Sequence, residues 1–249
     1  MAGHSHWTQI KRAKAVTDKR RGRVWSKLSR AIIVAARAGG GDPDTNLALR
    51  YAIDGAREEN MPRDTIERAI KKGTGEVEGA QYEELTYEGY APGGVALLLH
   101  VLTDNRTRTA GEVRNILEKG DGNLGASGSV GWMFAKRGIF LINATAADEE
   151  KLTDIALAAG ADDVRRDGEI FEMTCEPAAF IAVRQALADA KIATESAALT
   201  MEPSTRVAVT GEALDKVLKL IDTLEENDDV QNVYNNLEMS DADASRLSG

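Results

Sequence analysis

The chain has 249 residues, 43% of them hydrophobic and 29% charged, and its formal net charge is −9 at pH 7. This composition is typical of a folded protein of one to three domains with enough chain for real cores. No apolar run in the sequence approaches a membrane span, residues 1–12 lack the apolar core of a signal peptide, and the single Cys175 excludes an internal disulfide framework and a thiolate metal site. We therefore expect a cytoplasmic protein without a membrane partner.

The first predicted element is a basic helix over residues 18–37. Residues 1–40 contain ten Lys and Arg and one acid, Asp18, so this segment carries +9 in an acidic chain. On a helical wheel an apolar arc separates from a cationic arc, with Arg21 as the exception on the apolar side. The apolar arc contains Trp25, Leu28, Ile32, Ala35 and Ala36, and the cationic arc contains Lys19, Arg20, Arg23, Lys27, Arg30 and Arg37.

Four interpretations of the cationic arc are open: a solvated helix face, a transit peptide, a membrane-surface helix and a nucleic-acid contact. Six cations with no acid at i±4 repel one another, which favours a polyanion as partner. The small, Ala-rich apolar side limits insertion into a lipid surface. Residues 1–75 carry a net +8 and residues 76–249 a net −17. We therefore favour nucleic acid, with its footprint confined to the amino-terminal part and a few loops.

The chain up to residue 78 is predicted to be a helical domain. A breaker cluster, Gly-Gly-Gly-Asp-Pro at residues 39–43, separates the basic helix from a second helix that Asp44 would cap and that ends near Asn60. Pro62 suits the first turn of a third helix, for which Gly73 is the expected stop. No strand-like run occurs among them.

Residues 79–134 and 205–240 are predicted to form one discontinuous α+β domain. The expected elements are strands at 84–90, 94–103 and 129–135, a helix at 106–119 and a Gly-rich loop at 120–128, then a strand at 205–209, a helix at 212–225 and a strand at 230–235. The βαβ tail is too small to form a stable sheet alone, so it is expected to complete the earlier ββαβ segment.

Residues 135–204 between these two segments have the order βαββαβ of a ferredoxin-like domain. The expected elements are strands at 138–143, 163–166, 169–175 and 193–201, helices at 148–159 and 177–190, and a hairpin turn at Asp167-Gly168. The predicted fold class is thus multidomain α and α+β: an N-terminal three-helix domain followed by two α+β domains, one ferredoxin-like and inserted in the other.

The sequence does not support an enzyme, a cofactor or a metal site. Residues 120–125 match G-x-G-x-x-G, but a helix precedes the motif and a strand follows it, the reverse of the dinucleotide-binding context. His100 lies in an apolar strand, where a hydrogen-bonded structural histidine is expected, and no Ser/His/Asp or Cys/His set emerges. Cys175 is expected to be a buried, inert thiol.

The segment Asp104-Asn105-Arg106-Thr107-Arg108-Thr109 lies where a central strand meets a helix. Two arginines at a helix N-terminus oppose the helix dipole unless an anion or an acid lies nearby. Two interpretations remain open: a capping turn with both arginines paired to acids of the chain, or a phosphate contact.

Four sequence blocks together resemble the YebC family. They are Ala2-Gly3-His4-Ser5-His6-Trp7 followed by Ile10-Lys11, Tyr-Glu-Gly-Tyr-Ala-Pro-Gly-Gly-Val-Ala at 87–96, Leu-Thr-Asp-Asn-Arg-Thr-Arg-Thr at 102–109, and Gly-Asn-Leu-Gly at 122–125 with Gly-Ser-Val at 128–130. The resemblance covers essentially the whole chain. It departs from the family at His6, where Lys is usual, and at Trp25, where Phe is usual, and a neutral His6 would weaken one phosphate contact or make it depend on pH.

The resemblance implies a helical domain, two α+β domains and a cytoplasmic, non-enzymatic protein of gene expression. Family members are described as probable transcriptional regulators, mitochondrial translational activators, or ribosome-associated factors that ease elongation through stretches such as consecutive prolines. We favour an RNA- and ribosome-binding translation factor, with a DNA-binding transcriptional regulator as the alternative and the acidic domains as candidates for a protein partner. The oligomeric state stays open. The nucleic-acid-binding residues we expect are His4, Ser5, His6, Trp7, Lys11, Arg12, Lys14, Lys19, Arg20, Arg23, Lys27, Arg30, Asn105, Arg106 and Arg108.

Overall fold

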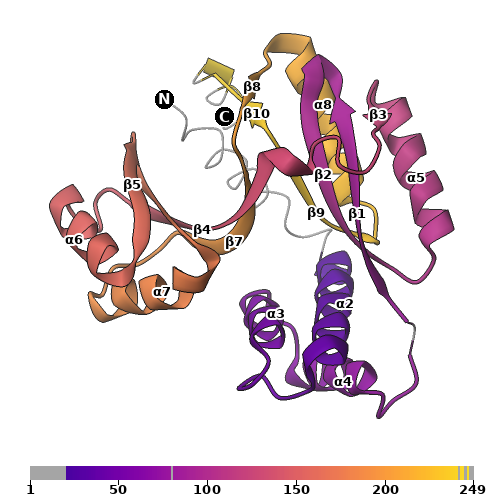
Figure 1. Ribbon diagram of the computed structural model, residues 1–249, viewed down its shortest axis with the longest axis horizontal. Coiled ribbons are helices and arrows are strands. Elements are labelled where there is room, and N and C mark those ends of the chain that lie inside the picture. The colour runs from indigo at the N-terminus through magenta and orange to yellow at the C-terminus, as the bar shows by residue number, and fades with distance from the viewer. Residues whose placement is uncertain (1–20, 80, 241, 244–245, 247–249) are drawn as a thin grey trace.

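The fold is a set of three domains, seen in a computed structural model that describes residues 21–79, 81–240, 242–243 and 246, with only the backbone at residues 21–23. Figure 1 shows a helical domain at the bottom, a sheet domain with helices α5 and α8 at the upper right, and a second α+β domain at the left. The predicted fold class is confirmed. The residue boundaries of the three domains remain predictions.

The described part of the helical domain contains α2 (Arg21–Gly39), α3 (Leu47–Glu58) and α4 (Arg63–Thr74). Their apolar faces form one core around Ile32, Leu49 and Ile53, which are at most 5% exposed. The prediction that Asp44 caps α3 is wrong. Asn46 is the N-cap: its side-chain oxygen accepts the Leu49 N–H at 3.1 Å, and its amide donates to the Ala35 carbonyl at 2.8 Å.

Gly73 lies inside α4 and does not end it, contrary to the prediction. The helix ends at Thr74, and Gly75, which has a φ of +83°, caps it in the left-handed conformation. A Cβ on Gly73 would lie 2.6 Å from the Ala36 Cβ and 2.6 Å from the Ile33 carbonyl oxygen. The glycine is therefore required for the close approach of α4 to α2.

The sheet domain is built from two segments of the chain. Its first segment contains β1 (Glu83–Ala91), η1 (Pro92–Gly94), β2 (Val95–Thr103), α5 (Arg106–Lys119) and β3 (Asn123–Leu124), and its second contains β8 (Val207–Ala208), α8 (Gly211–Glu225), β9 (Val230–Asn235) and β10 (Leu237–Glu238). The antiparallel sheet has the order β3-β1-β2-β9, and β8 pairs in parallel with β10. The tail thus adds β9 beside β2, the strand whose apolar run indicated a central position.

The two faces of β2 pack against different cores. Leu97, Leu99 and Val101 lie in a core with apolar residues of α5 and α8, whereas Ala96 and Leu98 pack on the other face with Val130 and Phe134 among others. Because both faces are covered, β2 is apolar at almost every position. His100 is half-buried, and its Nε2 lies 2.9 Å from the Glu84 Oε1 and its Nδ1 3.4 Å from the Asn232 Oδ1, which confirms a hydrogen-bonded structural role.

The inserted domain has the strand order β5-β6-β4-β7, all antiparallel, as expected for a ferredoxin-like βαββαβ fold. Helices α6 and α7 share a core with Phe140, Phe171 and the buried Cys175. Burial, together with nearby acids, raises the pKa of the Cys175 thiol, consistent with an inert group. The elements are β4 (Phe134–Asn143), α6 (Glu149–Ala159), β5 (Ala161–Asp167), β6 (Ile170–Cys175), η3 (Pro177–Ala179), α7 (Phe180–Asp189) and β7 (Ser196–Pro203).

The strand predicted at residues 129–135 is wrong. This segment is a turn followed by the short helix η2 (Gly131–Met133), and β4 then runs unbroken from Phe134. The physical reason is the Glu88 carboxylate, which accepts the Val130 and Gly131 N–H groups at 2.6 Å each and so removes them from any strand ladder.

Candidate nucleic-acid interface

Helix α2 carries five cations and no acid over its 19 residues. Its apolar face is fixed by Ile32, Ile33 and Ala36, which are buried against α3 and α4. Trp25 anchors the first half of the helix, because its indole N–H donates to the Glu59 carbonyl at 3.0 Å. The sequence pattern therefore places the apolar arc correctly on the core.

Two cations of α2 bind the C-terminal segment of the chain. The Lys27 ammonium donates to the Glu225 carbonyl at 2.6 Å, and the Arg30 guanidinium contacts the Asp228 carbonyl and lies 2.9 Å from the Asp229 carboxylate. No acid lies at i±4 of Arg30, as the sequence indicated, but Asp229, almost two hundred residues away in sequence, neutralises this cation.

Asp229 is the centre of a polar network that joins the helical domain to the sheet domain. The residue is 3% exposed, and its Oδ2 accepts hydrogen bonds from Thr103 at 3.0 Å, Thr109 at 2.6 Å and Arg108 at 2.6 Å. Burial disfavours its charge, but the hydrogen bonds from Thr109, Arg108 and Thr103 and the charge of Arg30 outweigh burial and lower the pKa of Asp229.

The turn at residues 104–109 contains the expected cap. Asn105 caps α5 by accepting the Arg108 N–H at 3.0 Å. Arg108 pairs with Asp104 at 2.9 Å and with Asp229, as the structural interpretation of this motif requires. The exposed Arg106 makes no salt bridge to any residue that the structure describes, and it remains a candidate for a phosphate contact.

Most of the expected nucleic-acid-binding residues lie outside the described side chains. Of these fifteen residues, the structure describes the side chains of Lys27, Arg30, Asn105, Arg106 and Arg108. It brings Arg30 and Arg108 onto the same carboxylate, that of Asp229. The other ten stay predictions: His4, Ser5, His6, Trp7, Lys11, Arg12, Lys14, Lys19, Arg20 and Arg23.

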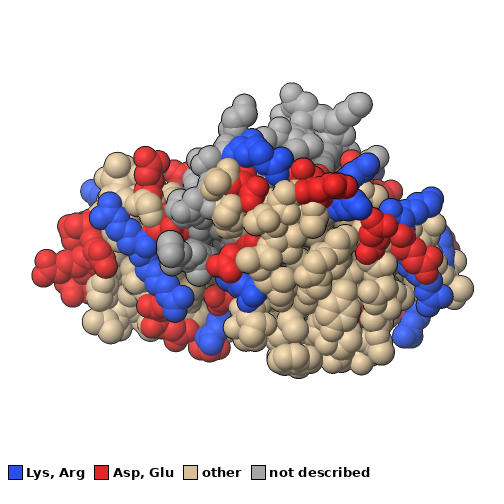
Figure 2. Space-filling model, turned by 90° about the horizontal axis from the view of Figure 1, so that it is seen from above, with Lys and Arg blue, Asp and Glu red and all other residues tan. Residues whose placement is uncertain are grey.

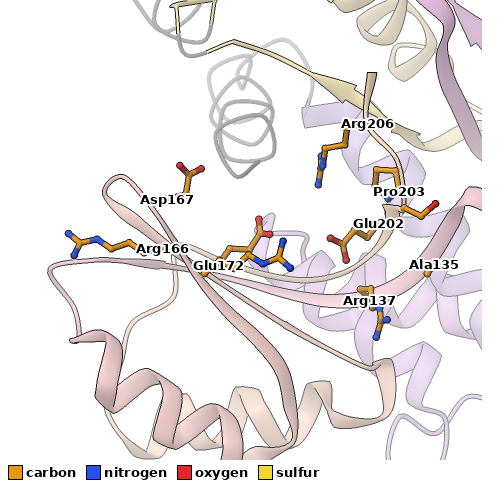
Figure 3. A pocket seen from close by; sticks show the side chains of 10 residues that line it. Ala135, Arg137, Arg166, Asp167, Glu172, Glu202, Pro203 and Arg206 are labelled. Carbon is orange, nitrogen blue, oxygen red and sulfur yellow. The ribbon is translucent and has the colours of Figure 1, made fainter. Parts of the chain in front are cut away.

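A groove of about 500 Å³ lies over the face of the inserted sheet. Figure 3 shows Glu172 and Glu202 together in this groove, with Arg206 extending toward it from the segment after Pro203. Burial raises the pKa of the Glu172 carboxyl, and the charge of Glu202 raises it further. The groove therefore brings together carboxylates and arginines.

The arginines of this groove have partners within the chain. Arg137 pairs with Asp162 at 3.0 Å and also with Glu176, and the Arg166 guanidinium lies 5.6 Å from the centre of the Phe171 ring. A phosphate would have to compete with these contacts and approach two carboxylates, so the groove does not fit a polyanion well.

The loop between α5 and β4 extends beyond the Gly-rich run predicted at 120–128, because the residues expected as a strand at 129–135 continue it up to β4. The Glu88 side chain accepts three backbone N–H groups of this loop, and the loop carries Trp132, whose side chain is 73% exposed. The sequence did contain a signal for an exposed aromatic residue, because Trp132 lies in a run rich in Gly and Ser. The strand expected at 129–135 led to a different interpretation of this run.

The glycines of the G-x-G-x-x-G match allow close packing in this structure, since a Cβ on Gly122 would lie 2.5 Å from the Tyr90 carbonyl oxygen.

Charge is mixed on the surface of the described chain. Figure 2 shows acidic and basic side chains interspersed over the face seen from above, beside a broad area with few charged groups. Within the described residues, no group of His, Cys, Asp and Glu is arranged to hold a metal ion. None of the helices in that part of the chain is long and apolar enough to cross a membrane.

Two family models match nearly the whole chain. The TACO1/YebC protein N-terminal domain matches residues 5–76, and the TACO1/YebC second and third domain matches residues 82–237. A probable transcriptional regulatory protein of Geobacter sulfurreducens is 52% identical over 247 residues, covering 99% of this chain and 100% of the relative. Another of the same description, from Rubrobacter xylanophilus, is 51% identical over 250 residues and covers 100% of both chains.

A solved structure has the same fold. The crystal structure of a conserved hypothetical protein from Aquifex aeolicus superposes with a TM-score of 0.78 at 45% sequence identity, covering 90% of this chain and 93% of the other.

Proposed function

Because the chain belongs to the TACO1/YebC family, we propose that it is a non-enzymatic nucleic-acid-binding regulator of gene expression that acts in the cytoplasm. We propose further that its target is RNA on the ribosome, where it aids elongation through difficult sequences such as consecutive prolines. The related proteins described as probable transcriptional regulatory proteins support the coarser of these two statements.

The observation that carries the proposal is the basic amino-terminal segment of an acidic protein. Helix α2 has five cations and no acid, whereas the whole chain has a net charge of −9. Phosphates neutralise such a segment and release counterions, while the acidic remainder is repelled. Since Lys27 and Arg30 bind residues 225–229, the contact is assigned mainly to residues 4–23, with Arg106 as a second candidate.

The residues of the helical domain favour recognition of the nucleic-acid phosphate backbone and not of a particular DNA base sequence. Readers of the major groove place Arg, Asn or Gln along one exposed helix face. Helices α3 and α4 contain no Asn or Gln, and their exposed positions carry both charge signs. This pattern suits shape and phosphate recognition, which is common for structured RNA.

A DNA-binding transcriptional regulator is the second candidate function. The descriptions of the relatives in Geobacter and Rubrobacter favour it. In that case the same amino-terminal cations would bind duplex phosphates, and sequence preference would come from DNA shape.

The deciding experiment is sedimentation of the tagged protein through a sucrose gradient with cell extract. We expect the wild type to co-migrate with ribosomes, and we expect this association to be lost at high salt. Reversing Lys11, Lys14, Lys19 and Arg23 to Glu should abolish it. This variant spares Lys27 and Arg30, whose reversal would also disturb the junction with Asp229.

A matched control reverses four exposed cations elsewhere: Arg68, Lys119, Lys151 and Lys219 to Glu. It has the same net charge as the test variant and should still co-migrate with ribosomes. Retention of the wild type on one promoter fragment without ribosome association would replace RNA by DNA as the target. If the test variant bound polynucleotides like the wild type, the assignment of the interface would fail.

A further inference from the structure

Trp132 is an exposed aromatic side chain on the loop that enters the inserted domain. Its side chain is 73% exposed, although large aromatic residues normally bury most of their surface. It lies in η2, directly before β4 begins at Phe134. Most of the surface of this residue is therefore accessible to a partner.

The loop beneath Trp132 is held in one conformation by Glu88. Its carboxylate is 8% exposed and accepts the N–H groups of Gly128, Val130 and Gly131, each at 2.6 Å. The Glu88 carbonyl accepts the Gly125 N–H at 2.8 Å, so a single residue of β1 holds both ends of the turn. Charge-assisted bonds of this kind are among the stronger hydrogen bonds in proteins.

The indole itself is oriented by the same loop. The Trp132 Nε1–H donates to the Ser129 carbonyl at 3.2 Å, and the Tyr90 hydroxyl donates to that carbonyl at 3.2 Å. The polar edge of the ring is therefore satisfied within the chain. A ring held this way loses little conformational entropy when a partner stacks on it.

The surroundings of Trp132 favour a nucleobase over a protein as that partner. Residues 122–135 contain no charged side chain, and the exposed Lys136 follows directly. Protein-docking surfaces need a contiguous apolar patch. The other exposed large apolar side chains of the described chain, at residues 47, 77, 157 and 181, lie on other elements. A single aromatic ring amid backbone and small polar residues instead resembles a base-stacking platform.

We propose that Trp132 stacks on an unpaired nucleobase of the RNA that the amino-terminal cations bind. The inference rests on the proposed function and adds to it a preference for single-stranded over duplex segments. Stacking needs a base that has left its own helix, because bases inside a duplex present only their edges.

The test compares wild type, Trp132→Ala and Trp132→Phe by fluorescence anisotropy with a fluorescein-labelled oligouridine strand and with a blunt RNA duplex. Trp132→Ala should weaken binding of the single strand by on the order of tenfold, and Trp132→Phe by much less. Neither change should alter affinity for the duplex, whose contacts are to phosphates.

A second measurement reports on the ring directly in the folded protein. Labelling with 5-fluorotryptophan gives fluorine signals for Trp7, Trp25 and Trp132, and the Trp132→Phe variant identifies the third. Oligouridine should shift that signal. Leu157→Ala, which removes another exposed apolar side chain at 76% exposure, is the matched control and should bind like the wild type.

Failure of the inference can be told from failure of the proposed function. If amino-terminal charge reversal abolishes RNA binding but Trp132→Ala binds the single strand like the wild type, stacking is wrong and the proposed function stands. If Trp132→Ala keeps its RNA affinity but loses ribosome association, Trp132 contacts a protein and the inference is overturned. A wild type that binds no RNA overturns both.

Discussion

The carboxylates of Glu88 and Asp229 each organise one part of the molecule. Both are buried, and in each case burial opposes ionisation but several donors outweigh it and lower the pKa of the group. Glu88 shapes the loop before the inserted domain, and Asp229 joins α2, β2 and α5. A lowered pKa in the folded state means that ionisation of these groups stabilises the fold.

We predict that acid weakens the fold through these two groups. Their stabilising contribution is complete above the unfolded pKa of about 4 and is lost as the pH falls through the lower folded pKa. Asp229→Asn should lower the free energy of unfolding by about 2 kcal/mol at neutral pH, and the difference from wild type should shrink in acid. Urea denaturation between neutral pH and pH 3 measures this, and a difference independent of pH would contradict it.

Glu172 should behave in the opposite way. Its raised pKa means that the ionised form is disfavoured in the folded state, so the penalty is present above the folded pKa and disappears below the unfolded one. We expect Glu172→Gln to stabilise the protein by about 0.5–1 kcal/mol at neutral pH and to have no effect in acid. Thermal unfolding at neutral pH and in acid measures this difference. Glu118→Gln, a substitution at an exposed position, is the control.

At the scale of elements, two glycines in helices have opposite roles. A Cβ on Gly73 of α4 would clash with Ala36 and with the Ile33 backbone, whereas a Cβ on Gly111 of α5 would meet nothing within 4 Å. Intrinsic helix propensity favours Ala over Gly at both positions.

We predict that Gly73→Ala destabilises the protein by about 1–3 kcal/mol through overpacking. Gly111→Ala should stabilise it by about 0.5–1 kcal/mol, because the alanine restricts the unfolded chain and fits the helix. Chemical denaturation of the two variants side by side provides the comparison. Equal effects of the same sign would show that α2 and α4 do not approach as closely as described.

Sequence patterns gave the elements well where hydrophobic periodicity was strong. The helix at 106–119 and the strand at 230–235 have the predicted bounds, and the βαββαβ order gave the ferredoxin-like fold. Patterns failed where a distant partner decides local structure. Glu88 turns residues 128–131 away from a strand, and the position of Gly73 depends on the backbone of α2. The N-cap of a helix also depends on the local geometry, which is why Asn46 and not the predicted Asp44 caps α3.

The site was harder to predict for the same reason. The charge pattern identified α2 correctly as a cationic helix, but no local pattern pairs Arg30 with a carboxylate at residue 229. Arg108 was left open between an acid and a phosphate, and its partners could be assigned only once Asp104 and Asp229 had been placed. The exposure of Trp132 likewise depends on a loop that Glu88 holds.

At the scale of the whole molecule, the helical domain contacts both α+β domains. Through α2 it meets residues 225–229, and through α3 the Tyr51 ring packs edge-on against Phe180 of α7 at 6.0 Å between ring centres. The arrangement in Figure 1 is therefore held by a polar junction on one side and an aromatic contact on the other.

We predict that Arg30→Ala loosens the polar junction selectively. The variant lacks the bonds of Arg30 to residues 228 and 229. The fraction of molecules in which the helical domain has separated from the sheet domain should therefore rise on the order of tenfold or more. Hydrogen exchange of peptides spanning residues 225–230 should become faster, while the core strand β2 stays protected. Arg63→Ala, which removes an exposed pair with Glu67 inside α4, should leave these rates unchanged.

The chain enters and leaves the inserted domain at nearly the same point. Phe134 faces Pro203 as a paired position of β4 and β7, and the Ser204 N–H donates to the Met133 carbonyl at 2.8 Å. A short turn could therefore bridge residues 133 and 204 with little loss of chain entropy. In evolutionary terms the inserted domain is a unit that recombination could delete, exchange or duplicate, while the host sheet keeps the hydrophobic core that it forms with α5 and α8.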